Sequence, residues 1–165
     1  MRIIGVILLV LIGILVIACG SSGSSEPTES GLRERAEAWA TDISNEKWIE
    51  LHRFYRPEFR ESCPAGKFAK NIGLGWMMVR GTLGMDEDEK TEIRVIAVTV
   101  DGLNGWVTGE ALYKGEPLDF GDGPTSRNQW VFIDGQWWFA EQGNECTKWD
   151  TGKGWQSEGV AAALG

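Results

Sequence analysis

The pattern around Asp134-Gly135 predicts a β-hairpin that gathers side chains able to line a binding site. An Asp-Gly pair between two apolar segments, here Arg127 to Ile133 and Gln136 to Glu141, is typical of a two-residue turn. Such a turn sets the strand register, so Ile133 faces Gln136 and residues that face each other share one side of the sheet. That side carries an aromatic group made of Trp130, Phe132, Trp137 and Phe139.

In the same register, Asn128 and Glu141 face each other at the end of this aromatic side. A carboxylate is costly to bury unless it is paired, so its presence there needs a reason. An apolar pocket with a few polar groups is the usual ligand site, and these residues form a candidate pocket. The alternative, which we favour for the aromatic residues, is that they fill the core against helices. Asn128 and Glu141 remain the pair to test.

His52 is the single histidine of the chain. A histidine can serve as a general base near neutral pH, but a helical histidine without an identifiable partner is more often structural. No Ser-His-Asp order and no phosphate-binding loop accompanies it, and one His with two distant Cys does not make a zinc site. We therefore predict no catalytic residue, no metal and no cofactor, and keep His52 among the candidate pocket residues.

An unbroken apolar run from Ile3 to Ala18 follows Arg2 and ends at Cys19. As a helix this run would extend about 24 Å at ~1.5 Å per residue, short of the ~30 Å hydrocarbon core of a bilayer. The length favours a secretory signal peptide, and the alternative is an uncleaved anchor helix. Both interpretations place the rest of the chain outside the cytoplasm.

Two further cysteines, Cys63 and Cys146, leave an even number once Cys19 is modified. In an export compartment such a pair predicts a disulfide, which could contribute up to ~4 kcal/mol through the unfolded state.

The chain is expected to have four parts: a signal peptide over 1–18, a Gly/Ser-rich tether over 19–31, one domain over 32–146 and a Gly-rich tail over 147–165. The net charge of −8 argues against nucleic acid as a partner, because phosphates require Lys and Arg. It also argues against electrostatic binding to anionic lipids, so we expect membrane contact only through a lipid on Cys19.

Helical patterns occupy the first half of the domain, with apolar residues at three- and four-residue steps. The first stretch runs from Leu32 to Ile43 with Ser30 as its cap, the second starts at Ser44-Asn45 and stops at Pro57, and the third opens at Pro64. The acidic run over 86–89 is expected to be a solvated turn.

Strand patterns fill the second half of the domain, over 91–100, over 106–113 and in the hairpin, with a loop over 114–125. Helices followed by antiparallel strands predict the α+β class.

Two resemblances add to these inferences. The sequence Val16-Ile17-Ala18-Cys19 resembles the lipobox of bacterial lipoproteins, which implies a diacylglyceryl group on the cysteine and cleavage before it. The stretch from Leu32 to Gly143 resembles the nuclear-transport-factor-2-like superfamily, which includes polyketide-cyclase-like proteins. That resemblance rests on an Ala/Trp-rich first helix, on Asn45–Trp48 and Arg56–Phe59, on a helix begun at Phe68 and on the strand pair Trp130–Trp138.

The second resemblance implies N-terminal helices packed on a curved antiparallel sheet, with one sheet face around a cavity in a cone-like fold. Enzymes of that superfamily use acid and base residues in the cone, but none of their catalytic motifs can be placed on this sequence.

We expect a membrane-tethered lipoprotein of the bacterial cell envelope whose domain lies outside the cytoplasm and binds without catalysing a reaction. Its expected partners are the membrane, through the lipid on Cys19, and a small apolar ligand or an envelope protein. One alternative is a small cofactor-free enzyme that uses Glu141, Asn128 or His52 for acid–base catalysis. Another is a purely structural envelope lipoprotein with a filled core.

Overall fold

The computed structural model describes residues 26–86, 88–119, 123–140 and 146. Helices come first: α1 (Glu29–Ser44), α2 (Trp48–Leu51), the 3-10 helix η1 (His52–Phe54), α3 (Pro57–Ser62) and α4 (Ala65–Leu83). The strands follow: β1 (Thr91–Asp101), β2 (Asn104–Tyr113), β3 (Glu116–Pro117), β4 (Thr125–Ile133) and β5 (Gln136–Phe139). The α+β class is confirmed.

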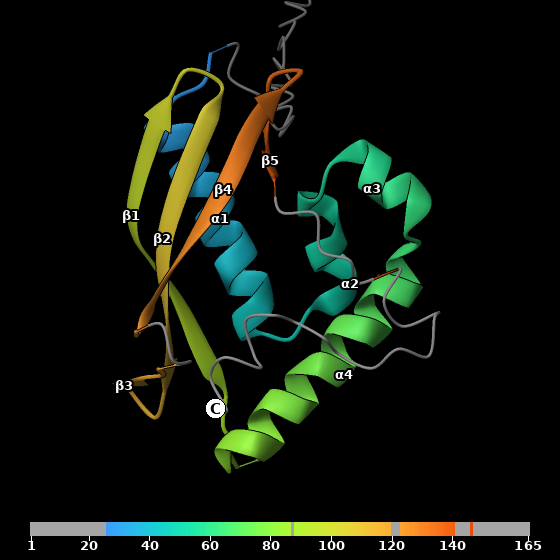
Figure 1. The fold of residues 1–165 in the computed structure, drawn as a ribbon, viewed down its shortest axis with the longest axis vertical. Coiled ribbons are helices and arrows are strands. Elements are labelled where there is room, and N and C mark those ends of the chain that lie inside the picture. Colours follow the sequence, from blue (N-terminus) through green and yellow to red (C-terminus); the bar gives the residue numbers. More distant parts are fainter. Residues whose placement is uncertain (1–25, 87, 120–122, 141–145, 147–165) are drawn as a thin grey trace, which may run out of the picture.

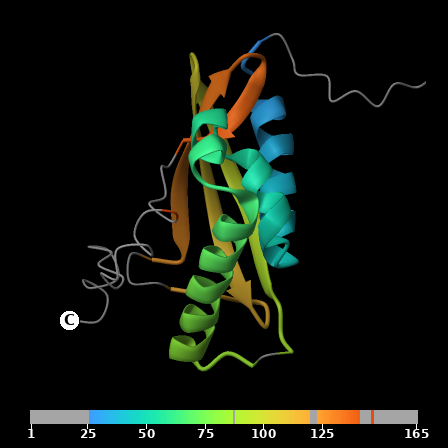
Figure 2. The ribbon, with the colours of Figure 1, turned by 90° about the vertical axis from the view of Figure 1, so that its right-hand side faces the viewer.

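The strands form one curled antiparallel sheet in the order β1-β2-β4-β5, and the short β3 pairs with the end of β2. Helix α1 packs along one face of this sheet, mainly against β1, and α2, α3 and α4 lie beyond the β5 side (Figure 1). The side view shows α1 beside the strands, at the right, and α4 in front of them (Figure 2). The core lies where α1, η1 and the sheet meet, because the buried apolar residues of these elements form one cluster.

Helix α1 buries Leu32, Ala36 and Ala40, whose four-residue spacing places them on one face. The cap predicted at Ser30 is wrong: Thr28 has the extended backbone of an N-cap, and its Oγ1 accepts a hydrogen bond from the Gly31 N–H at 3.1 Å. The helix therefore begins at Glu29, inside the stretch predicted as tether.

The second predicted helix is interrupted. It continues only through α2 and η1, because Arg56 precedes a proline and takes an extended conformation, with ψ of 151°. Pro57 then begins α3 instead of ending a helix, since a proline is tolerated at the first helical position, where its missing N–H is not needed.

Helix α4 confirms the third predicted helix and begins directly after Pro64. It ends at Gly84, whose φ of 64° lies in the left-handed region that a helix C-cap requires.

Strand β4 begins at Thr125, two residues before the predicted start, and pairs with β2 over that extension. The loop predicted over 114–125 contains β3. The signal peptide, Cys19 and most of the tether lie outside the described residues, as does the tail over 147–165. No helix among the described ranges is long and apolar enough to cross a membrane.

Candidate functional site

The predicted register of the β4–β5 hairpin is confirmed. Ile133 pairs with Gln136, Phe132 with Trp137 and Trp130 with Phe139. The turn residues Asp134 and Gly135 have φ of 51° and 77°, the left-handed conformations that a tight two-residue hairpin turn needs.

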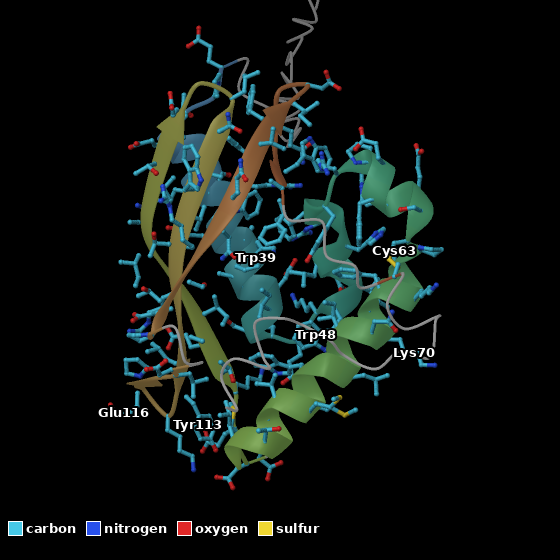
Figure 3. All side chains as sticks on the ribbon, in the orientation of Figure 1. Trp39, Trp48, Cys63, Lys70, Tyr113 and Glu116 are labelled. Carbon is cyan, nitrogen blue, oxygen red and sulfur yellow. A yellow bond between two sulfur atoms is a disulfide. The ribbon has the colours of Figure 1, made fainter. Side chains whose placement is uncertain are left out.

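The aromatic group is buried on the core side of this hairpin, with Trp130 fully enclosed. Trp39 of α1 stacks on Phe139 with ring centroids 5.4 Å apart, and it meets Trp130 edge-on at 6.2 Å. Figure 3 labels Trp39 between the sheet and the shorter helices. Phe54 and Tyr55 close the cluster against Trp130 and Phe139. The four hairpin aromatics therefore pack as core residues, and their role in lining a ligand stays a prediction.

Three tryptophans of this cluster carry a polar group without a partner. The indole N–H groups of Trp39, Trp130 and Trp137 are buried, and none of them donates a hydrogen bond within the described structure. A buried donor left unpaired is unfavourable, and such groups are commonly satisfied by water or by a ligand. Within the described part of the chain, these three indole donors therefore lack hydrogen-bond acceptors.

Asn128 lies half-buried in β4, opposite Val107 of β2. The backbone N–H of Ala140 donates to the carbonyl of Gln129 at 2.9 Å, which continues the hairpin register one residue past β5. Glu141 itself lies outside the described residues, so its pairing with Asn128 stays a prediction.

His52 is held by structural contacts. Its Nε2 lies 2.6 Å from the carbonyl oxygen of Cys63, and its ring lies against Phe59 and Phe68. These contacts join η1 to the α3–α4 junction and include none of the other candidate pocket residues. No group of three metal-ligating side chains occurs within the described part of the chain.

Cys63 and Cys146 are both buried and lie at disulfide distance, with their Cα atoms 5.6 Å apart. This separation is in the usual range for a bridge, so the predicted pairing is confirmed in its geometry. The sulfur of Cys63 is visible at the start of α4 in Figure 3.

A cluster of arginines beside β5 was missed by the sequence analysis. The guanidinium of Arg35 in α1 lies 4.5 Å from the ring centroid of Phe54 and 5.6 Å from that of Trp138. Arg53 also stacks on Phe54, at 4.9 Å, and Arg60 on Trp138, at 5.0 Å. The arginines belong to different helical elements, so no local sequence spacing links them.

Neutral acceptors surround Arg35. Its Nη2 donates to the carbonyl of Arg53 at 2.9 Å and its Nε to the carbonyl of Trp137 at 3.3 Å. With its amide oxygen turned toward the guanidinium, Gln136 also accepts from Nη2 at 2.6 Å. Burial, with the positive charges of Arg53 and Arg60, lowers the pKa of Arg35 from its ordinary value to about 10. Arg35 therefore remains charged at neutral pH, with no ion-pair partner in the described ranges.

Comparisons with known proteins give little similarity. No family model matches the chain, and no curated protein matches it. A similar solved structure is the solution structure of a SEC-C motif containing protein from Rhodopseudomonas palustris, with 23% identity and a TM-score of 0.38. The match covers 74% of this chain and 79% of that one, and at this TM-score it carries no argument about function.

The recognition of a lipoprotein with a nuclear-transport-factor-2-like domain is contradicted, because the comparisons return a SEC-C motif protein and neither of those families. Among the motifs behind the resemblance to the nuclear-transport-factor-2-like superfamily were a tryptophan-bearing first helix and an aromatic hairpin. Both are packing patterns that any α+β domain with a large aromatic core can share. Lipid attachment at Cys19 itself stays a prediction, since that residue is not among those described.

Proposed function

We propose that this chain is a domain held outside the cytoplasm of a bacterium by a lipid on Cys19, and that it binds a ligand without catalysing a reaction. The apolar run that ends at Cys19 supports the tethering, because its length suits a signal peptide better than a permanent span. Two or more acyl chains would suffice to hold the domain at the membrane.

The observation that carries the binding function is that the buried indole N–H groups of Trp39, Trp130 and Trp137 have no hydrogen-bond partner among the described residues. They belong to one buried aromatic cluster between α1 and the β4–β5 hairpin. A ligand with an apolar body and hydrogen-bond acceptors would match both the rings and the free donors.

The contacts of His52 argue against the alternative of acid–base catalysis. Its imidazole is engaged with the Cys63 carbonyl and two phenylalanine rings, whereas a catalytic base needs access to substrate. Asn128, another residue of that alternative, lies in strand β4 of the sheet.

The test is an NMR titration of the full mature chain, labelled with ¹⁵N at the tryptophan indoles and kept in a non-ionic detergent. Fractions of a bacterial metabolite extract are added, and active compounds are recovered and weighed by mass spectrometry. We expect the indole signals of Trp39, Trp130 and Trp137 to shift together, while that of Trp106, whose ring lies against Arg127, stays unchanged as an internal control. The bound compound should be recovered with its mass unaltered.

Two results would contradict the proposal. Conversion of a compound that is lost in H52A or E141Q would establish an enzyme. Failure of every fraction to move the three core indoles would favour a purely structural domain.

A further inference from the structure

The arginine cluster beside β5 combines an excess of positive charge with aromatic support. Arg53 has one carboxylate partner, because its Nη2 donates to Oδ2 of Asp42 at 2.8 Å and Asp42 is buried. Neither Arg35 nor Arg60 forms an ion pair within the described residues. Within the described residues, the three guanidiniums thus have a single carboxylate partner, in a chain whose net charge is −8.

Arg60 carries a buried donor that calls for an acceptor. Its Nε is buried and has no hydrogen-bond partner within the described structure, although its guanidinium is held over the ring of Trp138. When a guanidinium stacks on an aromatic ring, its N–H groups point outward in the guanidinium plane. Two of them can then donate to the two oxygens of one oxyanion. An unpaired charged donor in such a place is unfavourable unless an acceptor is supplied.

The surroundings restrict what that acceptor can be. Arg35 already donates to neutral oxygens, and its pKa is lowered first by burial and then by the positive charges of Arg53 and Arg60. The side chain of Arg53 is 53% exposed, so the cluster is open to solvent on that side. A small negatively charged group can therefore reach the cluster and reduce the repulsion among its members.

We propose that Arg35, Arg53 and Arg60 form an anion-binding site beside β5, which takes an oxyanion such as a phosphate or a carboxylate group. Arg60 would bind it directly through Nε, which has no partner among the described residues, together with its terminal nitrogens. Arg53 would supply a second charge at the solvent side. The site is separate from the proposed binding of a ligand by the tryptophan cluster and does not depend on it.

Inorganic phosphate is the first probe, added to the full mature chain in dodecyl maltoside, a non-ionic detergent that brings no anion. The readouts are the indole signal of Trp138 and the Nε–H signal of Arg60 in ¹⁵N NMR spectra. We expect a saturable shift of both signals with phosphate and a weaker one with acetate, whereas potassium chloride of equal ionic strength has no such effect. The phosphate and acetate arms separate the two sources of oxyanion.

The variant is R60Q, and its matched control is R127Q, because Arg127 also lies over a tryptophan, with its guanidinium 5.2 Å from the ring of Trp106. R60Q should weaken phosphate binding about tenfold or more, as expected for losing charge-assisted hydrogen bonds, and R127Q less than twofold. If R60Q does not fold, R60K keeps the charge without the fork and should weaken binding severalfold.

Three outcomes would overturn the proposal: no saturable shift in the parent chain, equal weakening by R60Q and R127Q, or phosphate binding that appears only in E141Q. The last result would mean that the chain's own Glu141, close after β5 in the sequence, already supplies the carboxylate. None of these outcomes bears on the indoles of Trp39, Trp130 and Trp137, so the proposed function is tested separately.

Discussion

Asp86 and Lys114 form an exposed ion pair that connects the end of α4 to the turn after β2. The Lys114 ammonium lies 2.6 Å from Oδ2 of Asp86, and the Tyr113 hydroxyl lies 3.2 Å from the same oxygen. The hydrogen bond and the charge of Lys114, followed by the hydrogen bond of Tyr113, hold the pKa of Asp86 below its ordinary value. The predicted acidic turn over 86–89 thus contains a paired carboxylate at its first residue.

K114M should therefore raise the pKa of Asp86 back toward its ordinary value. A carboxyl group whose folded-state pKa is lowered contributes stability above its unfolded pKa, and this stability is lost as the pH falls through the folded pKa. In K114M that acid-dependent contribution should shrink. The measurement is a ¹³C NMR titration of the Asp86 carboxyl carbon, with K70M as the control because Lys70 is an exposed residue of α4. An Asp86 midpoint that does not move in K114M would refute the assignment.

Single residues also show where sequence reasoning succeeds and where it stops. The pairing of Trp130 with Phe139 could be predicted, because the local Asp134-Gly135 turn dictates it. The proximity of Arg35 to Arg60 could not be predicted, because the two residues belong to different helices that only tertiary packing brings together. The burial of the indole N–H groups could not be predicted either. Periodicity indicates which face of an element a residue occupies, but it does not indicate which atoms lie next to the polar group of its side chain.

At the scale of elements, two glycines differ in whether their surroundings leave room for a side chain. Gly105 lies in β2, and a Cβ there would collide with the Leu32 side chain and lie 3.0 Å from Cζ3 of Trp137. Gly81 lies in α4 with nothing within 4 Å of the same position. The first glycine allows α1 to approach the sheet closely, and the second only weakens its helix.

G105A should lower the free energy of unfolding by about 1–3 kcal/mol, the usual cost of overpacking a core. G81A should raise it by up to about 1 kcal/mol, because alanine favours a helix over glycine. Urea denaturation of both variants against the parent chain measures the two signs. A stabilising G105A would show that α1 does not pack on β2 as described.

Some element boundaries lie at residues that are themselves typical of helix ends. Helix α4 begins after Pro64 and ends at Gly84, both of which are local backbone signals. The region between α1 and α4 was harder, because Tyr55 leaves the helical conformation and bridges Phe139 of β5. That long-range pairing ends η1 at Phe54, shortly before Pro57, where the sequence predicted the end of the second helix.

At the scale of the whole molecule, the Cys63–Cys146 pair joins positions separated by 83 residues, so it spans most of the described domain. Removing the bridge in C63A/C146A should lower the free energy of unfolding by up to about 4 kcal/mol, since a long loop loses much of its entropy in the unfolded state when it is closed. Denaturation with and without reductant measures this effect. Reductant should destabilise the parent chain and leave the double variant unchanged. Identical unfolding of the oxidised and reduced parent chain would contradict the predicted contribution.

The central claim about the whole molecule is that a lipid on Cys19 attaches it to a membrane. The mass of the mature chain and of its N-terminal peptide tests this claim most directly. The full chain is expressed in a bacterial host, extracted from its membranes and analysed by intact mass and by fragmentation of the N-terminal peptide. We predict that the mature chain begins at Cys19 and carries a diacylglyceryl group, whereas C19S keeps residues 1–18 and lacks the lipid. A parent chain that starts at Met1 without lipid, with C19S bound to the membrane at the same size, would contradict the account and establish an uncleaved anchor helix.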